Sequence, residues 1–379
     1  MSDALLVTWD GAGNLPPEHS LVRALIARGH TVRALAHESV RPALEADGAQ
    51  WLPVPGLRHY DSKEPMAREE EMRFVVQEIW FARAFGSALL EAVQSRRPDL
   101  LLVDVSLTHA LVAARHTRLP TVVLCHLPYH LVLGPFAPLL DALLPDTNAY
   151  AASLGVPPFA SHQALLESGS LVLVFTYRSF DAVDTVAPHV VHVGPLRTSP
   201  RGGASWRRLS SGRPLVVVGL STSHQDQLSL MQRICDALAT LDVEVVVTTG
   251  PAVTPEALTV AANTTVVPFV PHDVVLPSAG LLVTHAGHGT VMAGATYGVP
   301  LLCLPMGRDQ PMIAARVVEL GIGAEASADA SVDDIRRAVA GCLADAGIRR
   351  RAADYTRLVA GHPGLDHAVA SIERLLHGP

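Results

Sequence analysis

The chain has 379 residues, 49% of them hydrophobic and 17% charged, so it is large and apolar enough for two buried cores. Its formal net charge of −7 at pH 7 argues against nucleic acid as a partner. The four cysteines stand far apart in the sequence and form no C-x-x-C pair, which indicates reduced thiols. The sequence shows neither the pattern of a secretory leader nor a run of about 18 apolar residues. We therefore expect a two-domain cytoplasmic protein with no nucleic acid partner and no membrane insertion.

The first part of the chain predicts a strand, a loop, a helix and a second strand. The strands are the apolar runs Ala4–Thr8 and Thr31–Ala36, and Glu18–Arg28 carries apolar residues on one helical face. This order is the opening of a Rossmann-like half. The loop has two glycines, but Pro16 stands where the third glycine of the dinucleotide fingerprint belongs, which disfavours a nicotinamide dehydrogenase.

The remainder of the N-terminal half alternates predicted helices and strands. Met72–Ser95 has helical periodicity and several aromatic residues, most of which we expect in the core. Two apolar runs predict strands, one ending at Asp104 and the other just before His126. The proline-rich segment 131–168 predicts short helices.

Residues 197–213 mark the clearest change in composition. This segment carries glycines, serines and five arginines, which is typical of an exposed linker between domains. We therefore predict an N-terminal Rossmann-like domain at 1–196, a linker at 197–213, a C-terminal Rossmann-like domain at 214–362 and a last helix at 363–379.

The most informative stretch is Leu281–Arg316. A short apolar strand is followed by the glycine-rich turn 285–290 and by the start of a helix. Such a turn directs backbone N–H groups and the positive end of a helix dipole at one point, which suits a phosphate. Asp309 and Gln310, which follow the next predicted strand, suit the hydroxyls of a sugar.

Four elements of this stretch fall in one window: H-x-G-x-G-T at 285–290, G-V-P at 298–300, D-Q at 309–310 and A-R-V at 315–317. Together they resemble the donor-binding signature of the family 1 glycosyltransferases, most of all the actinobacterial antibiotic and macrolide-type enzymes. The resemblance implies the GT-B fold, an α/β architecture in which two Rossmann-like β/α/β domains face each other across a cleft. It also implies that the C-terminal helix crosses back to the N-terminal domain.

The same resemblance implies a donor site in the second domain. Phe269 would stack on the nucleobase, and the hydroxyls after the strand Pro214–Leu220 would face the diphosphate. Ala293 stands where relatives that use ribonucleotides often have a glutamate for the ribose, which favours a dTDP-sugar over a UDP-sugar. The expected donor-binding residues are Ser221, Thr222, Phe269, Val270, His272, His285, Gly287, His288, Gly289, Thr290, Asp309 and Gln310.

One departure from the family concerns the general base. Relatives usually carry P-x-x-G-H-x-x-P in the first loop, whereas here Asn14 takes the place of the histidine and cannot accept a proton. Another residue acts as base, or the acceptor is acidic enough to need only orientation, or the protein is catalytically weak. The catalytic candidates are Asp10, Asn14, His19 and Asp104, and the acceptor-binding candidates are Phe74, Trp80, Phe81 and His126.

The predicted function is therefore that of an inverting hexosyltransferase (EC 2.4) that needs no metal and no cofactor beyond its nucleotide diphosphate sugar. The acceptor is expected to be a small hydrophobic natural product, aromatic or polyketide. A nucleotide-sugar epimerase of GT-B fold and a non-catalytic nucleotide-sugar-binding or activator partner are the alternatives. The sequence leaves open the acceptor, the sugar, the linkage atom, and whether the chain forms a homodimer.

Overall fold

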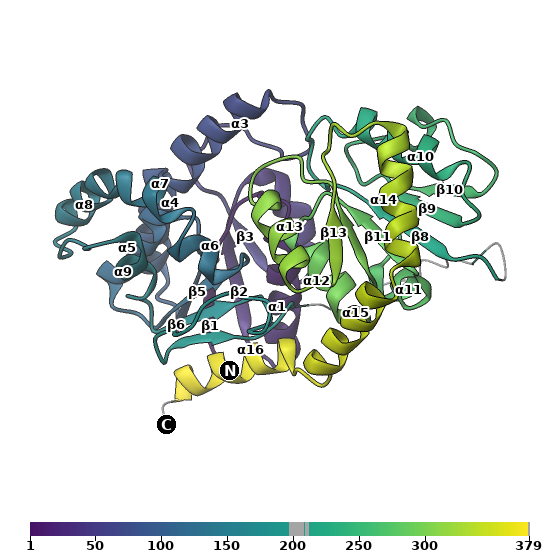
Figure 1. Ribbon diagram of the computed structural model, residues 1–379. Coiled ribbons are helices and arrows are strands. Elements are labelled where there is room, and N and C mark those ends of the chain that lie inside the picture. The colour runs from purple at the N-terminus through teal and green to yellow at the C-terminus, as the bar shows by residue number, and fades with distance from the viewer. Residues whose placement is uncertain (197–207, 209–211, 378–379) are drawn as a thin grey trace. The chain divides into compact units, whose positions relative to one another are not determined.

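The computed structural model describes residues 1–196, 208 and 212–377 (Figure 1). The chain divides into two compact units, which are described separately. The first comprises the described residues of Met1–Ser62, Met66–Arg197 and His362–Pro379, and the second those of Lys63–Pro65 and Thr198–Gly361. Most of the expected linker 197–213 lies outside the described residues. No helix in the described part of the chain is long and apolar enough to span a membrane.

The first unit is built on a parallel seven-stranded sheet in the order β3-β2-β1-β4-β5-β6-β7. The central strands are buried on both faces, which explains why they are continuous apolar runs rather than alternating ones. The strands are β1 (Asp3–Val7), β2 (Thr31–Leu35), β3 (Gln50–Leu52), β4 (Leu100–Asp104), β5 (Thr121–Cys125), β6 (Leu171–Val174) and β7 (Val190–His192).

Helices cover both faces of this sheet. The segment expected as one helix over Met72–Ser95 is interrupted, since a π-helical segment at Val75–Trp80 is followed by extended backbone at Ala82. The helices are α1 (Leu15–Ala27), α2 (Arg41–Ala46), α3 (Arg68–Phe74), α4 (Arg83–Ser95), α5 (Thr108–Thr117), α6 (Tyr129–Leu133), α7 (Ala137–Ala142), α8 (Leu144–Ser153), α9 (His162–Leu166) and α16 (Gly364–His377).

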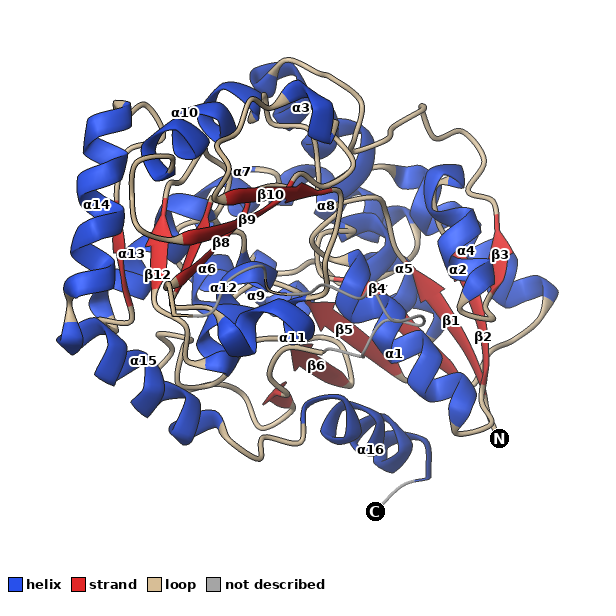
Figure 2. Cartoon of the chain, turned by 90° about the vertical axis from the view of Figure 1, so that its right-hand side faces the viewer, coloured by secondary structure: helices blue, strands red, loops and turns tan. Residues whose placement is uncertain are grey.

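The last helix, α16, packs on the first unit beside α1, as Figures 1 and 2 show. Val369 and Ile372 are buried in the same core as Leu21 and Leu25 of α1. Burial of these side chains stabilises the helix by roughly 1.5–3 kcal/mol each. The prediction that the C-terminal helix returns to the N-terminal domain is therefore confirmed.

The second unit is also built on a parallel sheet, with the order β10-β9-β8-β11-β12-β13. The strands are β8 (Leu215–Gly219), β9 (Glu244–Thr248), β10 (Thr264–Val267), β11 (Leu281–Thr284), β12 (Leu301–Cys303) and β13 (Gly323–Glu325). The helices are α10 (Leu228–Leu238), α11 (His272–Val275), α12 (His288–Tyr297), α13 (Gln310–Glu319), α14 (Val332–Ala344) and α15 (Ala346–Val359). Both units thus have the Rossmann-like architecture that the sequence predicts.

Candidate active site

Polar side chains gather in the first unit where the order of its strands reverses. β2 lies on one side of β1 and β4 on the other, so the loops after β1 and β4 diverge and leave room at the carboxyl edge of the sheet. Val7 pairs in register with Val103, which brings Thr8 and Asp104 side by side at the strand ends. This is where a parallel α/β sheet ordinarily binds its ligand.

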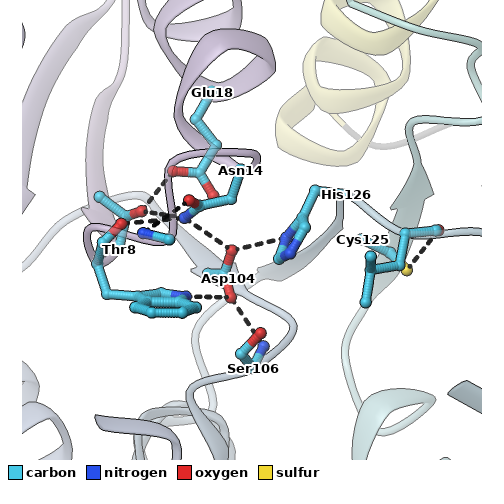
Figure 3. A network of polar contacts seen from close by, with 10 residues as sticks. Thr8, Asn14, Glu18, Asp104, Ser106, Cys125 and His126 are labelled. Atoms are coloured by element: carbon cyan, nitrogen blue, oxygen red, sulfur yellow. Dashed lines mark hydrogen bonds and ion pairs between the residues drawn. The ribbon is translucent and has the colours of Figure 1, made fainter. Parts of the chain in front are cut away.

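Asp104 is the centre of this group of side chains (Figure 3). Its side chain is fully buried, and its Oδ1 accepts hydrogen bonds from Trp9 Nε1 at 3.3 Å and from the Ser106 N–H at 2.8 Å. Its Oδ2 accepts from Asn14 Nδ2 at 3.3 Å and lies 3.0 Å from Nδ1 of His126. Every neighbour is a donor, so the site is built to hold a carboxylate.

Asn14 closes the loop that follows β1. Its Nδ2 also donates to Thr8 Oγ1 at 3.2 Å and to the Trp9 carbonyl at 3.1 Å, and its Oδ1 accepts the Gly11 N–H at 3.1 Å. A Cβ at position 11 would lie 2.7 Å from the Trp9 ring, so glycine is required there by space. Asn14 therefore orients the loop against Asp104.

A second carboxyl group, Glu18, is buried in the same cluster. Thr8 Oγ1 donates to its Oε2 at 2.5 Å. Burial, followed by the charge of Asp104, raises the pKa of Glu18 well above its usual range. Burial alone would also raise the pKa of Asp104, but the charge and contact of His126 outweigh it and hold that pKa below its ordinary value. The proton therefore stays on Glu18, and Asp104 carries the negative charge.

We expect the stability of Glu18→Gln, measured relative to wild type, to increase as the pH rises. Because the folded-state pKa of Glu18 is raised, its contribution is complete below the unfolded pKa of about 4.3 and is lost as the pH rises through the folded pKa. Glutamine does not ionise, so the variant does not lose this stability as the pH rises. Urea midpoints of both proteins between pH 5 and 8 measure it, and the exposed matched variant Glu38→Gln serves as control. Midpoints of wild type and Glu18→Gln that change in parallel with pH would contradict the assignment.

The other two catalytic candidates lie in separate contacts. Asp10 is buried and accepts hydrogen bonds from Ser62 Oγ at 2.8 Å and Ser39 Oγ at 3.1 Å. His19 pairs with a different carboxylate, since its Nδ1 lies 2.5 Å from Asp47 Oδ2. The structure therefore brings together Asn14 and Asp104 from the candidate set, while Asp10 and His19 each have their own polar partners.

The aromatic candidates fall into two groups. Phe74 stacks on Tyr60 with ring centroids 5.7 Å apart, and Trp80 meets Trp9 edge to face at 6.3 Å. Phe81 instead lies against His109. Trp9 joins the first group to Asp104 through its indole N–H. Within the described residues, the buried Nε1 of Trp80 has no hydrogen-bond partner, which leaves a donor for a bound molecule.

The second unit has its own reversal point, between β8 and β11. Thr284 pairs with Gly219, so His285 and the residues after Leu220 meet at the carboxyl edge. His285 is buried, and burial followed by the charge of Arg308 lowers its pKa to about 4, so it is neutral at neutral pH. A Cβ at position 287 would lie 2.6 Å from its Nε2, so the backbone of Gly287 passes directly against the imidazole.

Helix α12 starts at this point with Gly287 as its N-cap residue, which makes no side-chain capping hydrogen bond. Its first backbone hydrogen bond runs from the Val291 N–H to the Gly287 carbonyl, so the N–H groups of 288–290 precede the helical ladder. A Cβ at Gly289 would meet no atom within 4 Å, so there is open space beside the first turn. The uncapped turn and this space fit an anion.

The loops after β8 and β12 form one hydrogen-bonded network. Gln310 is buried, its Oε1 accepts the N–H groups of Met306 and Gly307, and its Nε2 donates to Gln225 Oε1 at 2.8 Å. Gln225 in turn donates to Ser221 Oγ at 2.7 Å. These contacts hold the residues after β8 in a loop, and α10 begins only at Leu228.

The remaining donor candidates lie around this network. Arg308 donates to Ser223 Oγ at 3.0 Å and adds a cation beside His285. Thr222 is exposed and Asp309 half-buried in the neighbouring loops, and His288 and Thr290 lie in the first turn of α12. Phe269 is 66% exposed after β10, next to the buried Val270 and to His272 at the start of α11.

Comparison with known proteins supports the family that the sequence resembles. The model of the erythromycin biosynthesis protein CIII-like C-terminal domain matches residues 232–375. The chain is 27% identical to 4'-demethylrebeccamycin synthase of Lentzea aerocolonigenes, over 98% of this chain and 99% of that protein. The solved glycotransferase of kitacinnamycin superposes with a TM-score of 0.81 at 26% identity, covering 99% of both chains.

This chain is a glycosyltransferase of GT-B fold, and over its full length it is similar to family 1 natural-product glycosyltransferases. The similar proteins include enzymes named for antibiotics, such as demethyllactenocin mycarosyltransferase of Streptomyces fradiae, and glycosyltransferases of this kind use nucleotide sugars as donors. A further solved structure, glycosyltransferase VinC in complex with dTDP, has the same fold, with a TM-score of 0.77 at 21% identity over 99% of both chains.

Several polar residues of this glycosyltransferase escape prediction from sequence. Glu18 and Trp9 reach Asp104 only through the strand order, and Arg308 reaches Ser223 across 85 positions of the chain. A signal did exist for Arg308, since it is a cation placed directly before the D-Q pair. No comparable signal marks Glu18, because an acidic residue in the first turn of a helix is ordinary.

Proposed function

We propose that this glycosyltransferase moves a sugar from a nucleotide diphosphate sugar, a dTDP-sugar in preference to a UDP-sugar, to a small hydrophobic acceptor of aromatic or polyketide type. The transfer inverts the anomeric carbon and needs no metal ion. The observation that carries the proposal is the uncapped N-terminus of α12, with open space beside Gly289 and a neutral imidazole at its side.

The leaving diphosphate is held by groups of the second unit. Backbone N–H groups of 288–290 and the helix dipole stabilise negative charge, and the Thr290 hydroxyl adds a donor. His285, neutral at neutral pH, donates a proton in a hydrogen bond without bringing a charge of its own. Arg308 supplies the positive charge that a divalent cation supplies elsewhere. These donors support a transfer without metal.

Two observations support the thymidine nucleotide. Ala293 is fully buried in α12 and brings no carboxylate to the 2′-hydroxyl of a ribose. The solved structure of the relative VinC is a complex with dTDP. The exposed ring of Phe269 is in a position to stack on the base, and the half-buried Asp309 suits the sugar hydroxyls.

The first unit supports a flat, apolar acceptor. Phe74, Tyr60, Trp9 and Trp80 form one aromatic group, and the indole N–H of Trp80, unpartnered within the described residues, suits an oxygen of the acceptor. This group adjoins Asp104 through Trp9, so an acceptor on it is near the polar cluster. A single displacement then takes place opposite the leaving diphosphate, which inverts the anomeric carbon.

The test uses the purified protein with dTDP-glucose and, separately, UDP-glucose, against a panel of phenols and macrolide aglycones in excess EDTA. We expect glycosylated product by mass spectrometry with dTDP-glucose at a kcat/KM at least several-fold above that with UDP-glucose, and a β-linkage by NMR from the α-linked donor. Product that forms only after addition of Mg²⁺, or a retained α-linkage, would disprove the metal-independent inverting mechanism.

A further inference from the structure

His126 and Asn14 approach the same atom from the segments that follow β5 and β1, the two neighbours of β4 in the sheet. Nδ1 of His126 lies 3.0 Å from Oδ2 of Asp104, and Nδ2 of Asn14 donates to that oxygen at 3.3 Å. Figure 3 shows the two side chains on either side of the carboxylate. We propose that His126, oriented by Asp104, is the general base that deprotonates the acceptor hydroxyl, so that the base comes from the end of β5 rather than from the loop after β1.

The orientation of the ring fits this role. Nδ1 is buried 3.0 Å from Oδ2 of Asp104, an ion-pair contact whose angles are outside those of a hydrogen bond, while the side chain as a whole keeps 11% of its surface exposed. Because Nδ1 is buried, this exposed surface belongs to other atoms of the side chain. A carboxylate at Nδ1 keeps the proton on that nitrogen and leaves Nε2 unprotonated and able to accept one.

The proposed step rests on the transfer to a hydroxyl acceptor described above. The acceptor O–H proton moves to Nε2 of His126 as the oxygen bonds to the anomeric carbon. The bond between that carbon and the phosphate oxygen breaks, and the nucleoside diphosphate leaves with the electron pair. The imidazolium, stabilised by the Asp104 carboxylate, then releases its proton to solvent.

The charges around the pair support this arrangement. Glu18, which faces Asp104 from α1, has a raised pKa because of burial and of the Asp104 charge, so it adds no second anion at neutral pH. Asn14 and Trp9 face Asp104 as neutral donors. Burial raises the pKa of the adjacent Cys125 thiol, so it stays protonated. Asp104 is thus the one carboxylate of this cluster that balances an imidazolium.

The other candidates are held in different contacts. Asp10 accepts two serine hydroxyls, and His19 pairs with Asp47. His130, which follows closely on His126, pairs instead with Asp181 at 2.7 Å, and Asp181 also holds His192. These contacts fix loops of the first unit. His126 instead contacts Asp104, which lies at the end of β4 where the strand order of the sheet reverses.

The experiment compares His126→Ala with wild type, using the donor that wild type accepts and a series of 4-substituted phenols. We expect kcat to fall about 10²–10⁴-fold for phenols with a pKa of about 10, and the acid limb of the pH profile to disappear. The loss should shrink for 4-nitrophenol, which ionises near neutral pH without a base. In the double variant Asn14→His/His126→Ala, a histidine at position 14 reaches the same Asp104 oxygen and should restore at least tenfold.

His116→Ala, an exposed histidine on the same unit, is the matched control and should keep wild-type kcat and pH profile. A His126→Ala enzyme within threefold of wild type, or one that loses equally on all phenols, would overturn the proposal. An independent measurement needs no acceptor: ¹⁵N NMR of the whole protein, with the His126 signals assigned by their loss in His126→Ala. The neutral ring should carry its proton on Nδ1, and a proton on Nε2 would also overturn it.

Discussion

Gly287→Ala is expected to lower kcat by about 10²–10³-fold, because it displaces the imidazole that we propose to face the leaving diphosphate. The added Cβ would lie 2.6 Å from Nε2 and 2.7 Å from Cε1 of the buried His285. The backbone at Gly287 is extended, with φ −61° and ψ 132°, so alanine adopts it without strain and the collision with the ring is the cause. We also expect a stability loss of about 1–3 kcal/mol from overpacking. Steady-state kinetics and urea denaturation measure both.

Gly289→Ala is the matched variant two residues further on. Its Cβ meets no atom within 4 Å, and alanine favours the helix by up to about 1 kcal/mol, so the variant should be at least as stable as wild type. If the diphosphate occupies that space, the methyl group should nonetheless weaken binding of dTDP at least tenfold by calorimetry. A stable Gly289→Ala protein with wild-type affinity for dTDP would move the phosphate site away from this turn.

Asp104→Asn is expected to lower kcat by about 10²–10⁴-fold and the free energy of unfolding by about 3–5 kcal/mol. The carboxylate accepts from Trp9 Nε1, Asn14 Nδ2 and the Ser106 N–H, and His126 lies against its Oδ2. An asparagine in this place must turn its own NH₂ group toward one pair of donors. The contact between this NH₂ group and the donors lowers the stability, and the loss of the negative charge beside His126 lowers kcat.

Asp99→Asn is the control for this substitution, since Asp99 is an exposed carboxylate just before the same strand. It should change kcat less than twofold. Asp104→Asn with unchanged kcat but lowered stability would show that the carboxylate serves the fold alone. The kinetic and denaturation measurements on the two variants separate these outcomes.

The sequence alone predicted the strand, turn and helix on which the proposed donor site is built. The strand, turn and helix over 281–297 are contiguous, so their glycines and histidines could be interpreted without knowledge of the fold. The parallel strands were predictable for a similar reason, since each is buried on both faces and is a continuous apolar run. The return of the last helix to the first unit was predicted from the family resemblance.

The tertiary structure decided the rest, because the polar cluster around Asp104 is assembled from distant parts of the chain. Trp9, Asp104 and His126 follow β1, β4 and β5, and only the strand order makes them neighbours. Phe74 and Trp80, which lie on one helical stretch, contact Tyr60 and Trp9 from earlier loops of the chain. Local periodicity carries no information on such contacts, since they depend on which strands are adjacent and on which side chains share one buried charge.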